Sequence, residues 1–312
     1  MRTAKQIYSV ADLQNWSEVA RRIKPPIRLG VFGDPISHSL SPPIQNAALQ
    51  ECALKMQYVR ILVSPAELSQ AIGLCRPNGF VGLNLTAPHK RPVVALVDSI
   101  DESVNQLEAI NTIAIRQGKL VGFNTDGVGF SRAVREVFSV DLRDLRVLVL
   151  GAGGAARAIA FECGRHSCER LVVASRTRSS AENLALEVQH FFTGPRVLGP
   201  FARLQAIGWT ERELRLQLEH IDLVVNASPL GLNPSDPSPV AAQLLGPHLM
   251  VFDTTYGPSR SALIRAALDV GARWSTGLPM LLHQGAASFE IWFEREAPLG
   301  VMRAALEKAA GG

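Results

Sequence analysis

Strand-like apolar runs alternate with amphipathic, helix-like runs along most of the chain. In the first half, the strand-like runs lie at 27–33, 58–63, 79–85 and 111–116. The helix-like runs between and after them lie at 42–54, 65–74, 89–97 and 102–108. Strands joined by crossover helices build parallel, doubly wound sheets, so this order predicts an α/β fold.

The same alternation resumes after residue 127. Strand-like runs recur at 145–150, 170–175, 222–227 and 249–254. Helix-like runs lie at 127–138, 154–165, 179–190 and 261–270, with two more expected within 278–309. Upstream of both sets, the apolar residues of 9–23 recur with a helical period, and Pro25 and Pro26 follow. A chain of 312 residues exceeds one ordinary hydrophobic core, so we expect two domains.

Composition narrows the class of protein. The chain is 47% apolar and 19% charged, which excludes collagen-like, coiled-coil and disordered chains. The net charge of +4 comes without a Lys/Arg block, so we expect no nucleic-acid partner. We also expect no membrane, because no run of about 18 apolar residues lacks charge. Four irregularly spaced cysteines predict free thiols and no metal site; Cys163, His166 and Cys168 lack a second ligand pair. With no signal-peptide pattern, we expect a soluble, cytoplasmic protein.

A glycine-rich turn follows the apolar run at 145–150. Gly151, Gly153 and Ala156 form a GxGxxA pattern between a strand and a helix. Gly151 permits a tight turn, Gly153 lets the backbone approach a pyrophosphate, and Ala156 lets the helix pack closely on the strand. The helix N-terminus adds free N–H groups and a partial positive charge. We predict a dinucleotide site; the alternative is a glycine-rich loop without a ligand.

The next strand indicates which dinucleotide binds. An NAD-binding strand usually ends in an acidic residue that holds the ribose 2′-hydroxyl. Here the strand ends at Ser175, Arg176 and Thr177, and no carboxylate follows before Glu182. An arginine fork binds a 2′-phosphate, which an acid would repel. We therefore predict NADP(H), with a solvated surface arginine as the alternative for Arg176.

Three polar motifs in the first half each allow more than one interpretation when taken alone. Ser39 and Ser41 precede a predicted helix start at Pro42, where Ser41 is either a simple N-cap or part of an anion pocket. Lys90 follows Pro88, which predicts the first turn of a helix and is also compatible with a surface lysine. The third motif comprises Asn111-Thr112 and Asn124-Thr125-Asp126-Gly127, in which the second cluster could be a plain turn with Asp126 capping the next helix.

Taken together, these motifs resemble the shikimate dehydrogenase family. The resemblance covers residues 27 to about 290, and 1–26 lie outside it as an N-terminal extension. The matching segments, in the family's order, are SHSLSP, NLTAPHK, AINT, NTDG, GAGGAAR, SRT, NASPLG and GLPMLLHQ. One departure concerns the cofactor: the family's second arginine falls near Ser180, and Arg178 stands two positions earlier.

The resemblance implies the reversible, NADPH-dependent reduction of 3-dehydroshikimate to shikimate, a step of aromatic amino acid biosynthesis. It implies a catalytic pair, Lys90 and Asp126, with Lys90 delivering or removing the proton at the reacting oxygen. A nearby carboxylate favours the lysine cation, so we expect Asp126 to position both Lys90 and a substrate hydroxyl. The implied substrate-binding residues are Ser39, Ser41, Asn84, Thr86, Asn111, Tyr256 and Gln284. The implied cofactor-binding residues are Gly151, Gly153, Gly154, Ala155, Ser175, Arg176, Thr177, Gly277 and Met280.

The resemblance also sets the expected architecture and the alternatives. The substrate domain is predicted to comprise 1–126 and 278–312, and the Rossmann NADP-binding domain 127–277. A quinate or quinate/shikimate dehydrogenase is the main alternative, because one substrate hydroxyl decides between the two. A non-catalytic NADP-binding regulator is a further alternative, disfavoured because Lys90 and Asp126 are both present. We expect a monomer or a homodimer.

Overall fold

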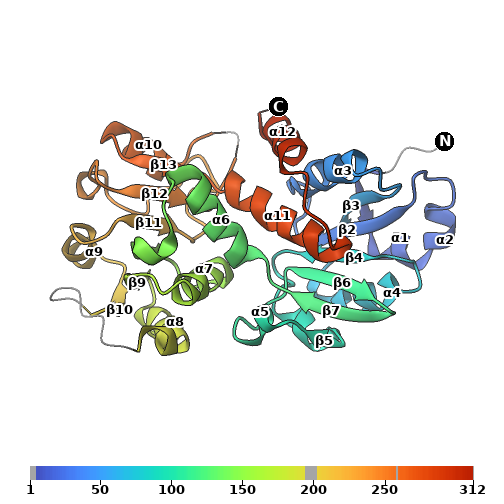
Figure 1. Cartoon of the computed structure of the whole chain (residues 1–312), viewed down its shortest axis with the longest axis horizontal. Helices are drawn as coiled ribbons and strands as arrows, with labels where there is room; N and C mark the ends of the chain where they lie inside the picture. Colours follow the sequence, from blue (N-terminus) through green and yellow to red (C-terminus); the bar gives the residue numbers. More distant parts are fainter. Residues whose placement is uncertain (1–4, 194–201, 258, 312) are drawn as a thin grey trace. The chain divides into compact units, whose positions relative to one another are not determined.

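The computed structural model describes residues 5–193, 202–257 and 259–311. The chain divides into two compact units (Figure 1). Unit 1 comprises Met1–Thr125 and Gln284–Gly312, and unit 2 comprises Asp126–His283. The second division falls six residues after the predicted boundary at 277/278, inside one continuous helix, α11 (Leu278–Phe293).

Unit 1 contains a mixed sheet. Its described strands are β1 (Ile7–Ser9), β2 (Ile27–Gly33), β3 (Gln57–Leu62), β4 (Gly82–Leu85), β5 (Ser99–Ile100), β6 (Thr112–Arg116) and β7 (Lys119–Phe123). Their order in the sheet is β1-β3-β2-β4-β6-β7-β5. β6 runs antiparallel to both β4 and β7, whereas the other described pairings are parallel. The expectation of purely parallel sheets is therefore wrong for unit 1.

A tight hairpin reverses the chain between β6 and β7. Gln117 and Gly118 both have positive φ, 50° and 75°, so they form the two-residue connection whose twist matches antiparallel strands. The pairing runs from Arg116 opposite Lys119 to Thr112 opposite Phe123. This hairpin delivers residues 124–126, the third polar motif, beside Asn111.

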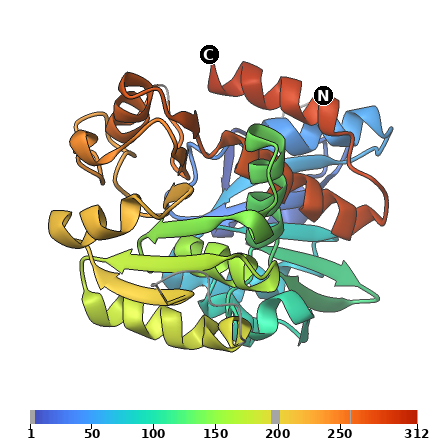
Figure 2. The same ribbon diagram turned by 60° about the vertical axis from the view of Figure 1, so that its left-hand side comes forward.

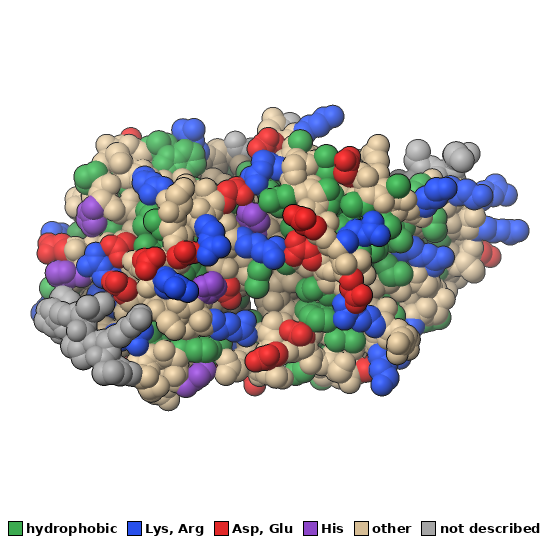
Figure 3. All heavy atoms as spheres, viewed as in Figure 1, with side chains coloured by type: hydrophobic (Ala, Val, Ile, Leu, Met, Phe, Trp, Pro, Cys, Tyr) green, Lys and Arg blue, Asp and Glu red, His purple; other side chains and the backbone are tan. Residues whose placement is uncertain are grey.

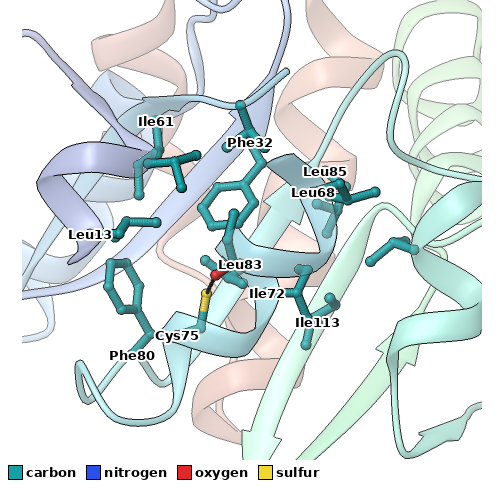
Figure 4. Packing of buried hydrophobic residues seen from close by; sticks show 14 of the residues in the cluster. Leu13, Phe32, Ile61, Leu68, Ile72, Cys75, Phe80, Leu83, Leu85 and Ile113 are labelled. Atoms are coloured by element: carbon teal, nitrogen blue, oxygen red, sulfur yellow. Dashed lines mark hydrogen bonds between the residues drawn. The ribbon is translucent and has the colours of Figure 1, made fainter. Parts of the chain in front are cut away.

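Helices and short 3-10 turns complete unit 1. The described segments are α1 (Val10–Gln14), α2 (Trp16–Val19), α3 (Ser41–Glu51), η1 (Pro65–Glu67), α4 (Leu68–Cys75), η2 (Pro92–Leu96), α5 (Glu102–Asn105) and α12 (Leu299–Ala310). α12 packs beside α3 (Figure 1). The core beneath α4 joins side chains from several strands, including Phe32, Ile61 and Leu83, all fully buried (Figure 4).

The N-terminal segment differs from the single helix predicted for 9–23. Residues 7–9 form β1, which pairs in parallel with β3 at the edge of the sheet. Ser9 then forms a capping box with Asp12, and this exchange of hydrogen bonds starts α1. Tyr8 and Trp16 are buried and in edge contact, with ring centroids 5.5 Å apart. The segment is thus an integral part of the unit 1 core.

Unit 2 contains a parallel sheet. Its described strands are β8 (Arg146–Leu150), β9 (Arg170–Ser175), β10 (Leu204–Gly208), β11 (Leu223–Asn226), β12 (Met250–Asp253) and β13 (Arg273–Ser275). Their order in the sheet is β10-β9-β8-β11-β12-β13. Figure 2 shows part of this sheet, coloured green to yellow. That order is the doubly wound arrangement in which ligands bind beyond the carboxyl ends of the strands. β8, β9, β11 and β12 match the predicted runs within one residue at either end.

The remaining segments of unit 2 connect these strands. They are α6 (Asp126–Phe138), η3 (Leu142–Asp144), α7 (Gly154–Arg165), α8 (Arg178–Val188), η4 (Gln189–Phe192), α9 (Glu211–Leu218), η5 (Ala242–Leu244) and α10 (Ala262–Asp269). Among the described residues, no helix is both long and apolar enough to cross a membrane. Acidic and basic side chains are interspersed over most of the face in Figure 3, as the near balance of charges predicts.

Candidate functional site

The first two polar motifs meet at the carboxyl ends of the neighbouring strands β2 and β4. Gly33 ends β2, and a Cβ there would lie 2.4 Å from Cγ2 of Thr86. Only glycine therefore permits this approach. Backbone hydrogen bonds fix the junction, from the Thr86 amide to the Phe32 carbonyl at 2.9 Å and from Asp34 to Ala87 at 3.2 Å. The structure thus brings Thr86 beside the loop that carries Ser39 and Ser41.

Ser39 and Ser41 are both half-buried in the loop that leads into α3. Of the two interpretations left open for Ser41, the simple N-cap is wrong: the helix begins at Ser41 itself, and Leu40 occupies the cap position. The Ser41 amide instead donates to Oγ of Ser39 at 3.3 Å. The Ser39 carbonyl accepts from Nε and Nη2 of Arg60, at 3.0 and 2.6 Å. A guanidinium ion therefore braces the loop and adds positive charge, which suits an anionic ligand.

Asn84 lies at the centre of a buried polar network. Its Oδ1 accepts from the hydroxyl of Tyr58 at 2.8 Å. Its Nδ2 donates to the carbonyl of Asn111, Oγ1 of Thr112 and Oγ of Ser288, at 3.0–3.1 Å. Burial raises the pKa of Tyr58 well above its ordinary value, so its phenol stays protonated and donates. The network fixes which way the Asn84 amide faces.

Asn111 connects three parts of the chain that are distant in sequence. Its Oδ1 accepts from the Thr125 amide at 2.9 Å, and its Nδ2 donates to Oγ1 of Thr125 at 2.9 Å. Oγ1 of Thr125 also lies 3.0 Å from the carbonyl oxygen of Gln284 on α11. Three predicted substrate-binding residues, Asn84, Asn111 and Gln284, therefore share one connected network within unit 1.

Lys90 is half-buried in a turn and not in the helix that the sequence predicted. The next helical segment, η2, starts at Pro92, which has no N–H to donate to the Pro88 carbonyl and so disfavours an α-helix that begins at Pro88. His89 is fully buried, and its Nε2 lies 2.7 Å from the Val63 carbonyl, which requires Nε2 to carry the hydrogen. The Lys90 carbonyl accepts from the Ile110 amide at 2.7 Å.

These contacts bring Lys90 near the residue that precedes Asp126. The Lys90 carbonyl accepts a hydrogen bond from the Ile110 amide, and the next residue, Asn111, accepts one from the Thr125 amide. Asp126 follows Thr125 directly, is 7% exposed and begins α6. The placement of a carboxylate at the helix N-terminus complements the helix dipole. The direct pairing of Lys90 with Asp126 stays a prediction.

In unit 2, the glycine-rich turn has the shape that a dinucleotide requires. Gly151 has a φ of 118°, and a Cβ there would lie 2.9 Å from the carbonyl oxygen of Ala227. By contrast, no atom lies within 4 Å of a Cβ built on Gly153 or Gly154, and both glycines are exposed. Gly153 caps α7 without a side chain, which leaves the first N–H groups of the helix accessible, and Ala155 follows half-buried in the first turn. These features fit a bound pyrophosphate.

The end of β9 carries the predicted 2′-phosphate site. Ser175 is buried at the last strand position, and Thr177 occupies the N-cap position of α8 without a capping hydrogen bond from its side chain. Arg176 is exposed, and no described residue forms a hydrogen bond or ion pair with it. Arg178, in contrast, donates through Nη1 and Nη2 to Oε1 of Glu213 at 3.2 and 2.7 Å. Arg176 is thus the guanidinium group available for a phosphate.

A polar cavity of about 120 Å³ lies within unit 2 beyond β12 and β13. Tyr256 lines it, and burial raises the pKa of its phenol. Asp253, 1% exposed, organises the loop by accepting from Asn226, Thr255 and Ser261. Gly277 packs against this loop, because a Cβ there would lie 2.1 Å from the carbonyl oxygen of residue 254. Met280, 9% exposed, lies one turn further along the chain.

Sequence reasoning missed the buried residues that connect the candidate site. These residues are Tyr58 and Ser288 in unit 1 and Asn226 and Asp253 in unit 2. Ser288 lies 176 residues from Thr112, to which it hydrogen-bonds at 2.8 Å. A local pattern does not reveal such a contact. Asp253 carried a usable signal, because it ends an apolar strand at the edge where ligands bind.

Comparison with known proteins gives the family. Residues 31–113 match the model of the shikimate dehydrogenase substrate binding domain, and 277–307 match the shikimate 5′-dehydrogenase C-terminal domain. A relative named shikimate dehydrogenase (NADP(+)), from Methanopyrus kandleri, is 40% identical over 89% of this chain and 94% of its own length.

Solved structures agree with this match. The shikimate 5-dehydrogenase of Thermus thermophilus, in complex with NADP(H) and shikimate, has a TM-score of 0.79 and 32% identity, covering 91% of this chain and 99% of that one. A quinate dehydrogenase from Corynebacterium glutamicum, in complex with NAD, has a TM-score of 0.78 and 28% identity, covering 90% and 99%. On the sequence identity and coverage of its relatives, this chain belongs to the shikimate dehydrogenase family.

Proposed function

We propose that the chain is an NADP-dependent shikimate dehydrogenase, which reversibly reduces 3-dehydroshikimate to shikimate. The observation that carries this proposal is the fixation of Lys90 and Thr125 to the consecutive residues Ile110 and Asn111. That arrangement holds the Lys90 backbone near the residue that precedes Asp126. The name of the Methanopyrus relative and the ligands of the Thermus structure support the same reaction.

The residues of unit 1 suit an acidic ring with hydroxyl groups. Ser39 and Ser41 offer hydroxyls beside the guanidinium of Arg60, so they would hold the substrate carboxylate. Thr86, Asn84, Asn111 and Gln284 would contact the ring hydroxyls. The family resemblance adds Tyr256 to the proposed substrate-binding residues. Asn84 and Asn111 are held rigid by their internal hydrogen bonds, which favours recognition of one hydroxyl pattern.

The chemistry assigned to Lys90 and Asp126 follows from charge. NADPH, when bound, supplies the hydride that reduces the substrate carbonyl. The Lys90 ammonium would stabilise the negative charge that develops on the reacting oxygen and donate the proton to it. Asp126 would hold Lys90 in its charged form and orient a substrate hydroxyl.

The residues of unit 2 fit NADP(H). The cradle of Gly151, Gly153, Gly154 and Ala155 at the start of α7 would bind the pyrophosphate, and Arg176 would bind the 2′-phosphate, flanked by Ser175 and Thr177. Gly277 and Met280 would border the nicotinamide. Under this proposal unit 1 is the substrate domain and unit 2 the cofactor domain.

Quinate is the alternative substrate. The similarity to the quinate dehydrogenase of Corynebacterium glutamicum supports including quinate in the substrate assays. Quinate carries one more hydroxyl than shikimate, and a single buried polar contact changes selectivity by orders of magnitude.

We also propose a cytoplasmic enzyme that acts as a monomer or homodimer without nucleic acid. Its four cysteines are free thiols, three of them buried, as is typical of a reducing compartment. Light scattering of the purified full chain distinguishes one copy from two.

A spectrophotometric panel tests the proposed function. Shikimate and quinate are each assayed with NADP⁺ and with NAD⁺, following the reduced nicotinamide. We expect the highest kcat/KM for shikimate with NADP⁺. In the Lys90→Ala variant, kcat should fall by about 10²- to 10⁴-fold while KM changes little. Lys119→Ala, on the exposed start of β7, is the control. A Lys90→Ala variant with unchanged kcat and raised KM would show that Lys90 only binds substrate.

A further inference from the structure

The charge around Arg178 sets it apart from its neighbour Arg176. Both amino groups of the Arg178 guanidinium point to Oε1 of Glu213, and Nε lies 3.9 Å from Oε1 of Glu182. Arg178 thus has two carboxylate partners, although its side chain is 49% exposed. Arg176, two residues earlier, has neither a hydrogen bond nor an ion pair with any described residue.

The sheet explains why Glu213 reaches this place. β10 pairs with β9 in parallel, with Gly208 opposite Ser175. The next amide, of Trp209, donates to the Ser175 carbonyl at 3.1 Å. The two strands therefore end together, and α9 begins beside the start of α8. Glu213, the third residue of α9, consequently lies next to the predicted 2′-phosphate site.

Glu213 is held in a defined position. Its amide donates to Oγ1 of Thr210 at 3.3 Å, and the same hydroxyl donates to Oε2 at 3.2 Å. Oε2 also packs over Gly208, where a Cβ would lie 2.4 Å away. Only 28% of the Glu213 side chain is exposed. The carboxylate is therefore a fixed negative charge, and Arg178 is fixed with it.

We propose that Glu213 determines how strongly the chain prefers NADP to NAD, by holding Arg178 away from the 2′-phosphate. This inference rests on the proposed NADP site. With Arg178 engaged, the phosphate has one guanidinium partner, Arg176. When Glu213 loses its charge, Arg178 gains the freedom to turn toward the phosphate as a second fork of donors.

The Glu213→Gln variant tests this role while preserving local structure. Glutamine has the same shape and accepts the Thr210 hydrogen bond, and it serves in helix caps as glutamate does. Isothermal titration calorimetry of the full chain with adenosine 2′,5′-bisphosphate measures the site without turnover. We expect binding about tenfold tighter than in the unmodified chain, as one added charge-assisted hydrogen bond at a half-exposed site gives. Adenosine 5′-diphosphate, which lacks the 2′-phosphate, should bind with unchanged affinity.

Two further variants isolate the mechanism. Glu211→Gln removes a carboxylate that pairs with Arg215 on the same helix, and it should leave both affinities unchanged. Arg178→Gln should have less than a twofold effect alone but should abolish the gain when combined with Glu213→Gln.

The outcomes separate this inference from the proposed function. The inference is overturned if the affinity of the Glu213→Gln variant for adenosine 2′,5′-bisphosphate is within twofold of that of the unmodified chain. It is also overturned if the gain in affinity persists in the double variant. If adenosine 2′,5′-bisphosphate binds neither the unmodified chain nor the variants, whereas adenosine 5′-diphosphate binds, the NADP assignment itself fails. In titrations with NADP⁺ and NAD⁺, Glu213→Gln should raise the ratio of NADP⁺ affinity to NAD⁺ affinity by the same factor as it raises the ratio for the two adenosine ligands.

Discussion

Replacement of Tyr58 by phenylalanine isolates one hydrogen bond at the centre of the unit 1 network. The Tyr58 side chain is 1% exposed and its ring lies 6.1 Å from that of Trp292, a packing contact that phenylalanine keeps. The variant loses only the hydroxyl, which donates to Oδ1 of Asn84 at 2.8 Å. The amide cannot turn over to compensate, because its Nδ2 is held by three other acceptors.

The expected loss of stability arises because Oδ1 of Asn84 stays buried without a hydrogen-bond donor. An unsatisfied buried acceptor costs about 1–3 kcal/mol. With a urea dependence of about 2 kcal/mol/M, a loss of 2 kcal/mol lowers the unfolding midpoint by about 1 M. Far-UV circular dichroism in urea measures this shift, and the KM for shikimate should rise because Asn84 is less firmly oriented.

Tyr8 provides the matched control for this experiment. It is equally buried, but its hydroxyl oxygen accepts from the amide of Lys5, an exposed residue whose N–H water satisfies once the hydroxyl is removed. Tyr8→Phe should therefore cost less than about 1 kcal/mol. If Tyr58→Phe is no more destabilising than Tyr8→Phe, the network does not contribute the stability assigned to it.

Three further predictions concern other parts of the fold. Burial alone would raise the pKa of Asp222, but hydrogen bonds from Arg146 lower it below its ordinary value near 3.9. The pair therefore stabilises the fold above that pH, and this stabilisation is lost as the pH falls through the lowered pKa. Asp222→Asn should cost about 1 kcal/mol at pH 7, and chemical denaturation at pH 7 and pH 3 should show the difference shrinking; a constant difference would contradict this. His89→Phe leaves the carbonyl of Val63, the residue after β3, without its 2.7 Å partner. The variant should lose about 1–3 kcal/mol of stability in urea titrations and should have a lower kcat, and unchanged stability would refute this. Gly277→Ala should lower the thermal midpoint and weaken NADP⁺ binding, because its methyl group meets backbone at 2.1 Å, whereas Gly73→Ala, with open space, should be neutral or stabilising.

Local patterns predicted the elements that run as continuous apolar strands. The run at 27–33 matches β2 residue for residue, and the glycine turn before α7 carries its own signature in Gly151 and Gly153. β7 was missed because it is short and carries Lys119 and Gly122, although the Gln117-Gly118 pair between two strands suits a hairpin. The residues that would touch substrate came from the family resemblance. Their supporting contacts join distant segments, which no local period encodes.

The N-terminal strand has a consequence for shortened versions of the chain. The family model begins at residue 31, yet the β1 segment shields the outer edge of β3, and Trp16 packs on Phe80 with ring centroids 5.3 Å apart. A chain that starts at residue 27 would uncover a row of unpaired backbone groups next to an opened apolar face. Such an edge is a template for strand addition by a second molecule, so truncation at the family boundary should produce self-association and loss of yield rather than a minimal enzyme.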